Sequence, residues 1–325
     1  MTWNFRLPRA LLLAAVLAAP ACSGDAPVEP ASPARAYLEQ MVGIMEQRSI
    51  NRLKIDWKSF RATVLADAAG AQSIPDTYPA IRTALRLLGD GHSFYRPVTG
   101  SAISVPTRTC ASASFSRPAL PADIGYVRVG SFSGTAAQAT AFARAIQDSI
   151  RANDREDLAG WIVDLRRNGG GNMWPMLAGV GPILGEGVVG YFIDPLGAET
   201  AWEYRDGTAR SGGSVTQRVD APYRLRRERP RVAVLTDNLV ASSGEAVAIA
   251  FRQRAGARSF GTATCGLSTA NATVPLSDGA TLYLTVSVMA DRTRVRYGDS
   301  VAPDETVADA GQAVQRAVAW LQSGT

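Results

Sequence analysis

From residue 124 onward, short apolar runs alternate with helical stretches, and this alternation constrains the fold most. The runs typical of strands cover residues 125–129, 160–165, 188–193, 231–236, 257–261 and 281–288. Apolar residues recur at helical spacing over residues 136–153, 173–184, 242–254 and 309–321. Strands separated by helices predict an α/β fold with a mainly parallel sheet, because parallel neighbours need a crossover connection.

The chain before residue 124 has a different pattern. Helical spacing of apolar residues predicts helices over residues 36–45, 55–66 and 78–88. Residues 97–123 are rich in Pro and Ser and too short to hold a further domain. We therefore expect a small N-terminal helical region over 35–96, a connecting segment over 97–123, and the α/β core over 124–325.

The first residues have the composition of an export signal. Two arginines precede the apolar run 11–19, which is too short to span a bilayer. Ala19-Pro20-Ala21-Cys22 resembles a bacterial lipobox, in which the cysteine becomes lipidated, and ordinary cleavage near Ala21 is the alternative. We expect a signal peptide over 1–21, a tether over 22–34, and an exported protein anchored through Cys22 to a bacterial membrane, facing the periplasm.

Composition disfavours several classes of partner. The net charge is +5, and its arginines are not interleaved with aromatic residues, so we expect no nucleic-acid partner. Besides Cys22 the chain has Cys110 and Cys265, which in an exported protein either form a disulfide or remain free thiols. One histidine and no CxxC disfavour zinc, and we expect neither metal nor cofactor.

A glycine-rich turn follows one predicted strand, in the sequence Asp164-Leu165-Arg166-Arg167-Asn168-Gly169-Gly170-Gly171. Glycines allow positive φ and leave backbone N–H groups uncovered, so such a turn can bind an anion or a developing oxyanion. A plain connection between strand and helix is the simpler interpretation. The absence of GK[ST] and GxGxxG disfavours a nucleotide site.

Two further segments carry candidate catalytic groups. Ser242 and Glu245 fit a capping box ahead of an apolar helix, which is a sufficient structural explanation. A serine at a helix N-terminus also lies where the helix dipole favours negative charge on its Oγ, with the Ser243 amide directed at a substrate carbonyl. His92 is the chain's single histidine and therefore the only imidazole available as a base.

Taken in order, DLRRNGGGN, ASSGEAVAIAF, GTATCG and APDE resemble the C-terminal processing (tail-specific) peptidases and the related tricorn core peptidase. YLEQMVGIMEQ, IDWKSFR and LGDGHSF resemble the helical bundle and histidine turn of the tricorn-like branch. The resemblance covers nearly everything after the predicted tether. It implies a ClpP/crotonase-type core, and segment 97–123 leaves no room for the PDZ domain that many of these peptidases carry.

The resemblance also implies roles for single residues. Ser242 matches the family nucleophile and His92 matches the base of the tricorn-like branch. The oxyanion hole falls on Gly170 or Gly171 together with the Ser243 amide, with Gly169 as the neighbouring alternative.

A Ser-Lys dyad does not fit this chain. The processing peptidases place a lysine where this chain has Leu267, and no lysine follows Lys58. The tricorn-like branch places a serine before its histidine, where this chain has Gly91. Candidates for orienting His92 are Asn271, Asp291, Asp299 and Glu245.

The sequence thus predicts a serine-type endopeptidase acting on a peptide or protein, and it leaves the oligomeric state open. A non-catalytic protein that binds a hydrophobic ligand or a peptide on the same fold is the alternative.

Overall fold

The computed structural model describes residues 33–111 and 116–324. The predicted signal peptide, most of the predicted tether and Cys22 lie outside the described residues. The first helix already begins at Pro33, inside the predicted tether. Within the described residues, no helix combines the length and apolar character needed to cross a bilayer.

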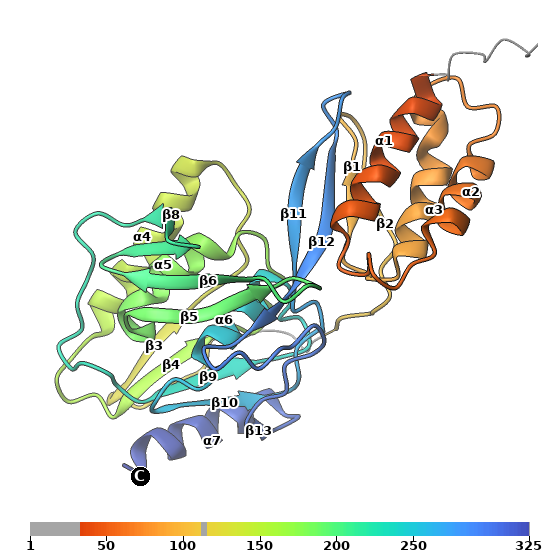
Figure 1. The fold of residues 1–325 in the computed structure, drawn as a ribbon. Coiled ribbons are helices and arrows are strands. Elements are labelled where there is room, and N and C mark those ends of the chain that lie inside the picture. The colour runs from red at the N-terminus through yellow and green to blue at the C-terminus, as the bar shows by residue number, and fades with distance from the viewer. Residues whose placement is uncertain (1–32, 112–115, 325) are drawn as a thin grey trace, which may run out of the picture.

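A five-stranded parallel sheet forms the base of the core (Figure 1). Its strands, in spatial order, are β13 (Glu305–Thr306), β10 (Ala257–Gly261), β9 (Val232–Thr236), β4 (Gly160–Asp164) and β3 (Ile124–Arg128). Every residue of β4 and β9 is buried, as their apolar sequences predict for strands covered on both faces. The expected α/β core with a parallel sheet is confirmed.

A second sheet, antiparallel, stands beside the first. Its order is β2 (Ile103–Ser104), β1 (Phe94–Arg96), β12 (Thr281–Ala290), β5 (Gly187–Ile193), β6 (Glu199–Arg205), β7 (Thr208–Ser211) and β8 (Ser214–Arg218), and β11 (Thr269–Pro275) also pairs with β12. The sequence predicted two of its strands, over 188–193 and 281–288, but not the antiparallel sheet, because strands such as β8 are largely exposed and lack an apolar run.

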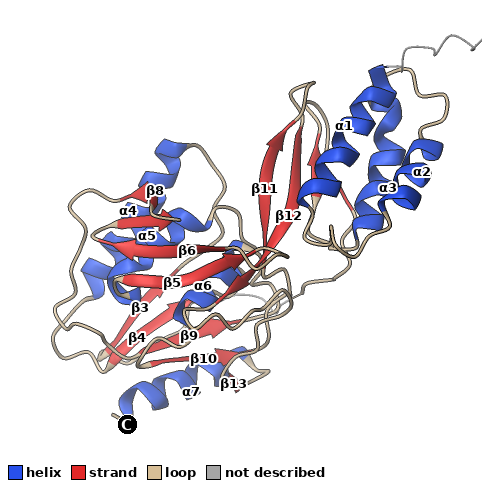
Figure 2. Ribbon diagram, viewed as in Figure 1, coloured by secondary structure: helices blue, strands red, loops and turns tan. Residues whose placement is uncertain are grey.

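Helices cover the parallel sheet on both faces (Figure 2). On one face, α7 (Ala310–Gln322) packs against β4, β9 and β10. On the other face lie α4 (Ala136–Asn153), α5 (Met173–Leu184) and α6 (Ser243–Phe251), and α6 contacts strands of both sheets. The largest apolar core therefore includes residues of both sheets and of all three helices between them.

The N-terminal helices form a separate core with β1, which follows them in the chain, and with β12, which lies much later. These helices are α1 (Pro33–Arg48), α2 (Trp57–Asp67), the short η1 (Pro75–Thr77) and α3 (Tyr78–Leu88). Their buried faces pack with Tyr95 of β1 and with Leu282 and Leu284 of β12. We call this unit, with β1, β2, β11 and the outer part of β12, the helical lobe, and the remainder the core lobe.

β12 joins the two lobes. Its first residues pair with β1 in the helical lobe, and its last three pair with β5 in the core lobe. Figure 1 shows β11 and β12 rising out of the core lobe to reach α1. A continuous strand thus sets the position of the histidine-bearing lobe relative to the serine-bearing lobe.

Candidate active site

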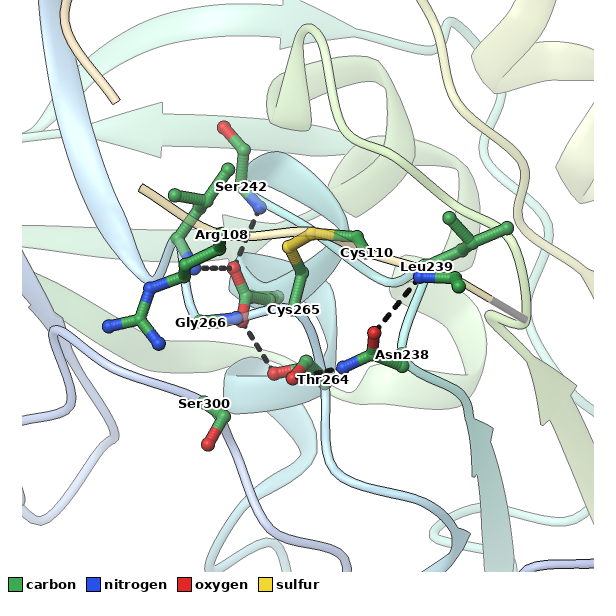
Figure 3. Close-up of a disulfide and its surroundings, with 12 residues drawn as sticks. Arg108, Cys110, Asn238, Leu239, Ser242, Thr264, Cys265, Gly266 and Ser300 are labelled. Atoms are coloured by element: carbon green, nitrogen blue, oxygen red, sulfur yellow. Dashed lines mark hydrogen bonds between the residues drawn. A yellow bond between two sulfur atoms is a disulfide. The ribbon is translucent and has the colours of Figure 1, made fainter. Parts of the chain in front are cut away.

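Ser242 sits in a tight turn between β9 and α6. Its backbone has φ 53° and ψ −117°, a conformation that non-glycine residues rarely adopt. Such strain persists only where surrounding contacts over-determine it, and it is concentrated at functional sites. Ser242 lines the cleft described below, and Figure 3 shows its hydroxyl pointing away from the nearby disulfide.

Glu245 holds this turn from below. Its buried carboxylate accepts hydrogen bonds from the Ser242 amide at 2.8 Å and from the Thr264 hydroxyl at 2.5 Å. It also accepts from the amides of Gly266 and Leu267, both at 2.8 Å. Burial raises the Glu245 pKa, and these hydrogen bonds oppose that rise. The structure therefore places Glu245 under the serine turn, as the capping interpretation predicts, rather than beside His92.

The glycine turn packs directly against Ser242. A Cβ added at Gly170 would lie 2.9 Å from the Ser242 Cβ, and Gly170 has φ +97°. The Gly170 amide already donates to Asn168 Oδ1 at 3.0 Å, so its N–H is not available to an oxyanion. The Ser243 hydroxyl donates to the Gly171 carbonyl at 2.6 Å. The Gly171 amide shares its peptide with the Gly170 carbonyl, which accepts from the Phe132 amide at 3.1 Å, and this contact orients that peptide. Of Gly170 and Gly171, the geometry therefore favours Gly171, with Gly169 as the remaining alternative.

His92 is held by its own turn and by a neighbouring strand. Asp90 Oδ1 accepts from the amides of His92, at 2.8 Å, and Ser93, at 2.6 Å. The Asn271 side-chain amide donates to the His92 carbonyl at 3.0 Å. Gly91 has φ +64°, and a Cβ there would lie 2.1 Å from Thr107 Oγ1, so a serine cannot occupy this position without rearrangement.

The His92 ring has a hydroxyl partner rather than a carboxylate. Its Nδ1 lies 2.7 Å from Thr269 Oγ1. Burial lowers the His92 pKa to about 4, and the Asp90 charge opposes this shift. The ring is therefore neutral at neutral pH. With the proton assigned to Nδ1, facing Thr269, the Nε2 lone pair is left to accept a proton.

The sequence missed Thr269. It lies 177 residues from His92, in a segment without a motif of its own, so no local signal pointed to it. Asn271 was expected near the ring and instead holds the His92 backbone. Asp291 accepts from Thr293, Val295 and Tyr297 and so holds a different turn.

A cleft of about 1280 Å³ between the lobes receives these groups. Its lining includes Ser242, Ser243, His92, Gly169 and Gly171. The two candidate catalytic residues therefore line the same cleft, although one comes from each lobe. Asp291 and Asp299 are not part of the lining among the described residues.

A disulfide ties the connecting segment to the serine turn (Figure 3). Cys110 is bonded to Cys265, which resolves the alternative that the sequence left open. Cys265 directly precedes Gly266, a donor to Glu245, and its own amide donates to the Val240 carbonyl at 2.8 Å. The bridge thus anchors the chain between the two lobes at the loop that supports the Ser242 turn.

The α/β core thus places a glycine turn against a serine in a strained backbone conformation. The sequence profile of Peptidase family S41 matches residues 123–307, and the chain belongs to this family. The family resemblance inferred from the motifs is thereby confirmed.

Known relatives agree in extent and fold. The chain is 27% identical over 295 residues to the nisin-resistance protein of Lactococcus lactis subsp. lactis, covering 90% of this chain and 88% of the relative. A lipoprotein from Streptococcus agalactiae has a similar structure, with a TM-score of 0.71 and 22% identity over 91% of this chain and 98% of that one. The photosystem II D1 C-terminal processing protease has a TM-score of 0.56 and 18% identity over 85% of this chain and 94% of that one. These likenesses extend the family fold to both lobes.

Proposed function

We propose that this member of the peptidase family is a serine-type endopeptidase with Ser242 as nucleophile and His92 as base. The observation that carries the proposal is the shared cleft, onto which the two side chains open from different lobes. A purely structural role for either residue would not require this convergence.

The first chemical step is acylation. Ser242 Oγ bonds to the carbonyl carbon of the peptide while His92 Nε2 accepts the hydroxyl proton. The imidazolium then protonates the leaving amine, the C–N bond breaks, and an acyl-enzyme remains. In the second step a water molecule gives a proton to His92 and its oxygen bonds to the acyl carbon. The bond to Ser242 Oγ then breaks, His92 returns the proton to that oxygen, and the acid is released.

Backbone amides stabilise the negative oxygen of the intermediate in this mechanism. The amides of Gly171 and Ser243 are the proposed donors. The Ser243 amide begins α6, where the first N–H groups lack an intrahelical acceptor and the helix dipole favours negative charge. Gly169 also lines the cleft, and its amide is the alternative to that of Gly171.

Ser243 is a weaker candidate for the nucleophile. Its hydroxyl is committed to the Gly171 carbonyl, and only 7% of the residue is exposed. The proposed division of labour gives Ser242 the chemistry and Ser243 the support of the oxyanion hole.

One experiment is covalent labelling with a serine-directed phosphonate. The other is hydrolysis of a fluorogenic peptide library and, separately, of nisin, the peptide for which the Lactococcus relative is named. The proposal expects labelling and turnover that are lost in Ser242→Ala and retained in Ser133→Ala, a serine that lines the same cleft. Binding of peptides without labelling or turnover would favour the non-catalytic alternative.

We further propose that the protein is exported and anchored through Cys22. The lipobox-like sequence and the disulfide support this, because disulfides persist in oxidising compartments. The similarity to a protein described as a lipoprotein is consistent with it. Incorporation of a labelled fatty acid, lost in Cys22→Ala, is the test.

A further inference from the structure

The walls of the cleft carry more positive than negative charge. In the described part of the chain, its charged lining consists of Arg48, Arg52, Arg96 and one carboxylate, Asp194. Asp194 is already paired, because its Oδ2 lies 2.8 Å from a terminal nitrogen of Arg52. Arg48 and Arg96 therefore give the cleft a positive electrostatic potential, and the concave shape of the surface strengthens it.

Arg96 lies on the same wall as His92. In β1, Tyr95 is buried in the helical lobe, so its neighbours Phe94 and Arg96 face the opposite side, where both line the cleft. Arg96 follows His92 by four residues, and only the last three of these form β1, so the two backbones are at most about 13 Å apart. A peptide extended along this wall therefore brings beside Arg96 a side chain within about four residues of the cleaved bond.

Neighbouring rings hold Arg96 in place. Its guanidinium carbon lies 5.7 Å from the centroid of the Tyr283 ring, which stacks on Phe94 with centroids 4.4 Å apart. Among residues 33–111 and 116–324, neither Arg48 nor Arg96 forms an ion pair. A guanidinium that is unpaired and rests on an aromatic ring offers a planar fork of donors matched to a carboxylate.

We propose that Arg96 binds a carboxylate of the peptide, with Arg48 adding positive charge to the same cleft, so that the enzyme prefers substrates with Asp or Glu within about four residues of the cleaved bond. This inference rests on the proposed peptidase function and names the substrate class of the same site. A carboxylate at the C-terminus of a peptide has the same chemistry, and the experiment separates the two sources.

The experiment compares kcat/KM for peptides blocked at both ends that carry Glu or its neutral isostere Gln at each position in turn. A second pair lacks acidic side chains and ends in either a free acid or an amide. We expect a preference of about fivefold for one carboxylate, weakening as salt is added. The double variant Arg48→Gln/Arg96→Gln should abolish it, whereas Arg86→Gln, an exposed arginine of the same lobe outside the cleft, should not.

Two further measurements keep the test decisive. Arg96→Glu should reverse the preference towards peptides with Lys at the selected position, which a merely unstable variant would not do. Peptide binding to Ser242→Ala, followed by fluorescence anisotropy, reports charge selection without catalysis.

The outcomes for the subsite and for the activity are distinct. Equal kcat/KM for Glu and Gln at every position, and for acid and amide ends, would overturn the subsite and leave the peptidase intact. Charge-selective binding to Ser242→Ala, without Ser242-dependent hydrolysis by the unaltered protein, would overturn the activity and leave the subsite.

Discussion

The two turns that carry the proposed catalytic groups are held in different ways. The Ser242 turn is fixed from within the core lobe by Glu245 and the loop that ends at Leu267. The His92 turn takes its outer contacts from β11, through Thr269 and Asn271. The strained, charged and buried part of the site is therefore built locally, whereas the base depends on how β11 and β12 connect the lobes.

This difference predicts that variants of the two turns fail differently. Changes under Ser242 should affect stability and chemistry together, because Glu245 is buried among several donors. Changes around His92 should affect chemistry first, because its ring has a single hydroxyl partner among the described residues.

The largest effect is expected for Ser242→Ala. Loss of the nucleophile should lower kcat on the order of 10⁴-fold or more. The melting temperature should not fall. The hydrogen bond to the Glu245 carboxylate comes from the backbone amide of residue 242, and alanine keeps that amide. Steady-state kinetics and thermal melts check this. Activity close to that of the unaltered protein would show that another residue is the nucleophile.

Removing the disulfide with Cys110→Ser/Cys265→Ser should act mainly on stability. The bond closes a loop with a sequence separation of 155, and loss of a native disulfide typically costs about 2–5 kcal/mol. Urea unfolding under non-reducing conditions measures this. The single variant Cys110→Ser should behave like the double variant, and an unchanged midpoint would mean that the bridge does not anchor the segment.

Thr269→Val should lower kcat by about tenfold to a hundredfold, on the scale of losing a group that orients a catalytic base. Thr269→Ser keeps the hydroxyl and should restore most of the rate. The unfolding midpoint should change little in either variant. If valine were as active as serine at this position, the hydroxyl would not orient the imidazole.

The smallest effect concerns pH. Because the His92 pKa is about 4, the acid limb of kcat/KM should lie near pH 4 rather than near the ordinary value of 6.5. Asp90→Asn keeps the acceptor oxygen and removes the charge that raises this pKa, so the limb should move slightly lower. An acid limb near 6.5 would contradict the buried, neutral ring.

The same pKa predicts how stability responds to acid. Between pH 6.5 and about 4 the unfolded chain binds a proton at His92 that the folded protein does not. This contribution to stability is therefore complete above pH 6.5 and is lost as the pH falls towards 4. In His92→Gln the unfolding free energy should depend less on pH across this window.

Sequence reasoning succeeded where local patterns determine structure. The fully buried strands β4 and β9 and the amphipathic helices follow from apolar periodicity, and Glu245 follows from capping chemistry. The half-exposed strands β6 to β8 carry no such signal.

Long-range details escaped the sequence. Thr269 meets His92 only because β11 pairs with β12, which is a tertiary event. The choice between Gly170 and Gly171 depends on which amide Asn168 occupies, and a run of identical glycines cannot reveal it.

The central claim is that Ser242 and His92 act as one unit across the two lobes. A double-mutant cycle with Ser242→Ala, His92→Ala and the double variant measures this directly through kcat/KM. The account predicts that the double variant is about as impaired as either single variant, because each change alone disables the same step. Losses that multiply in the double variant would show two independent contributions and would contradict the dyad.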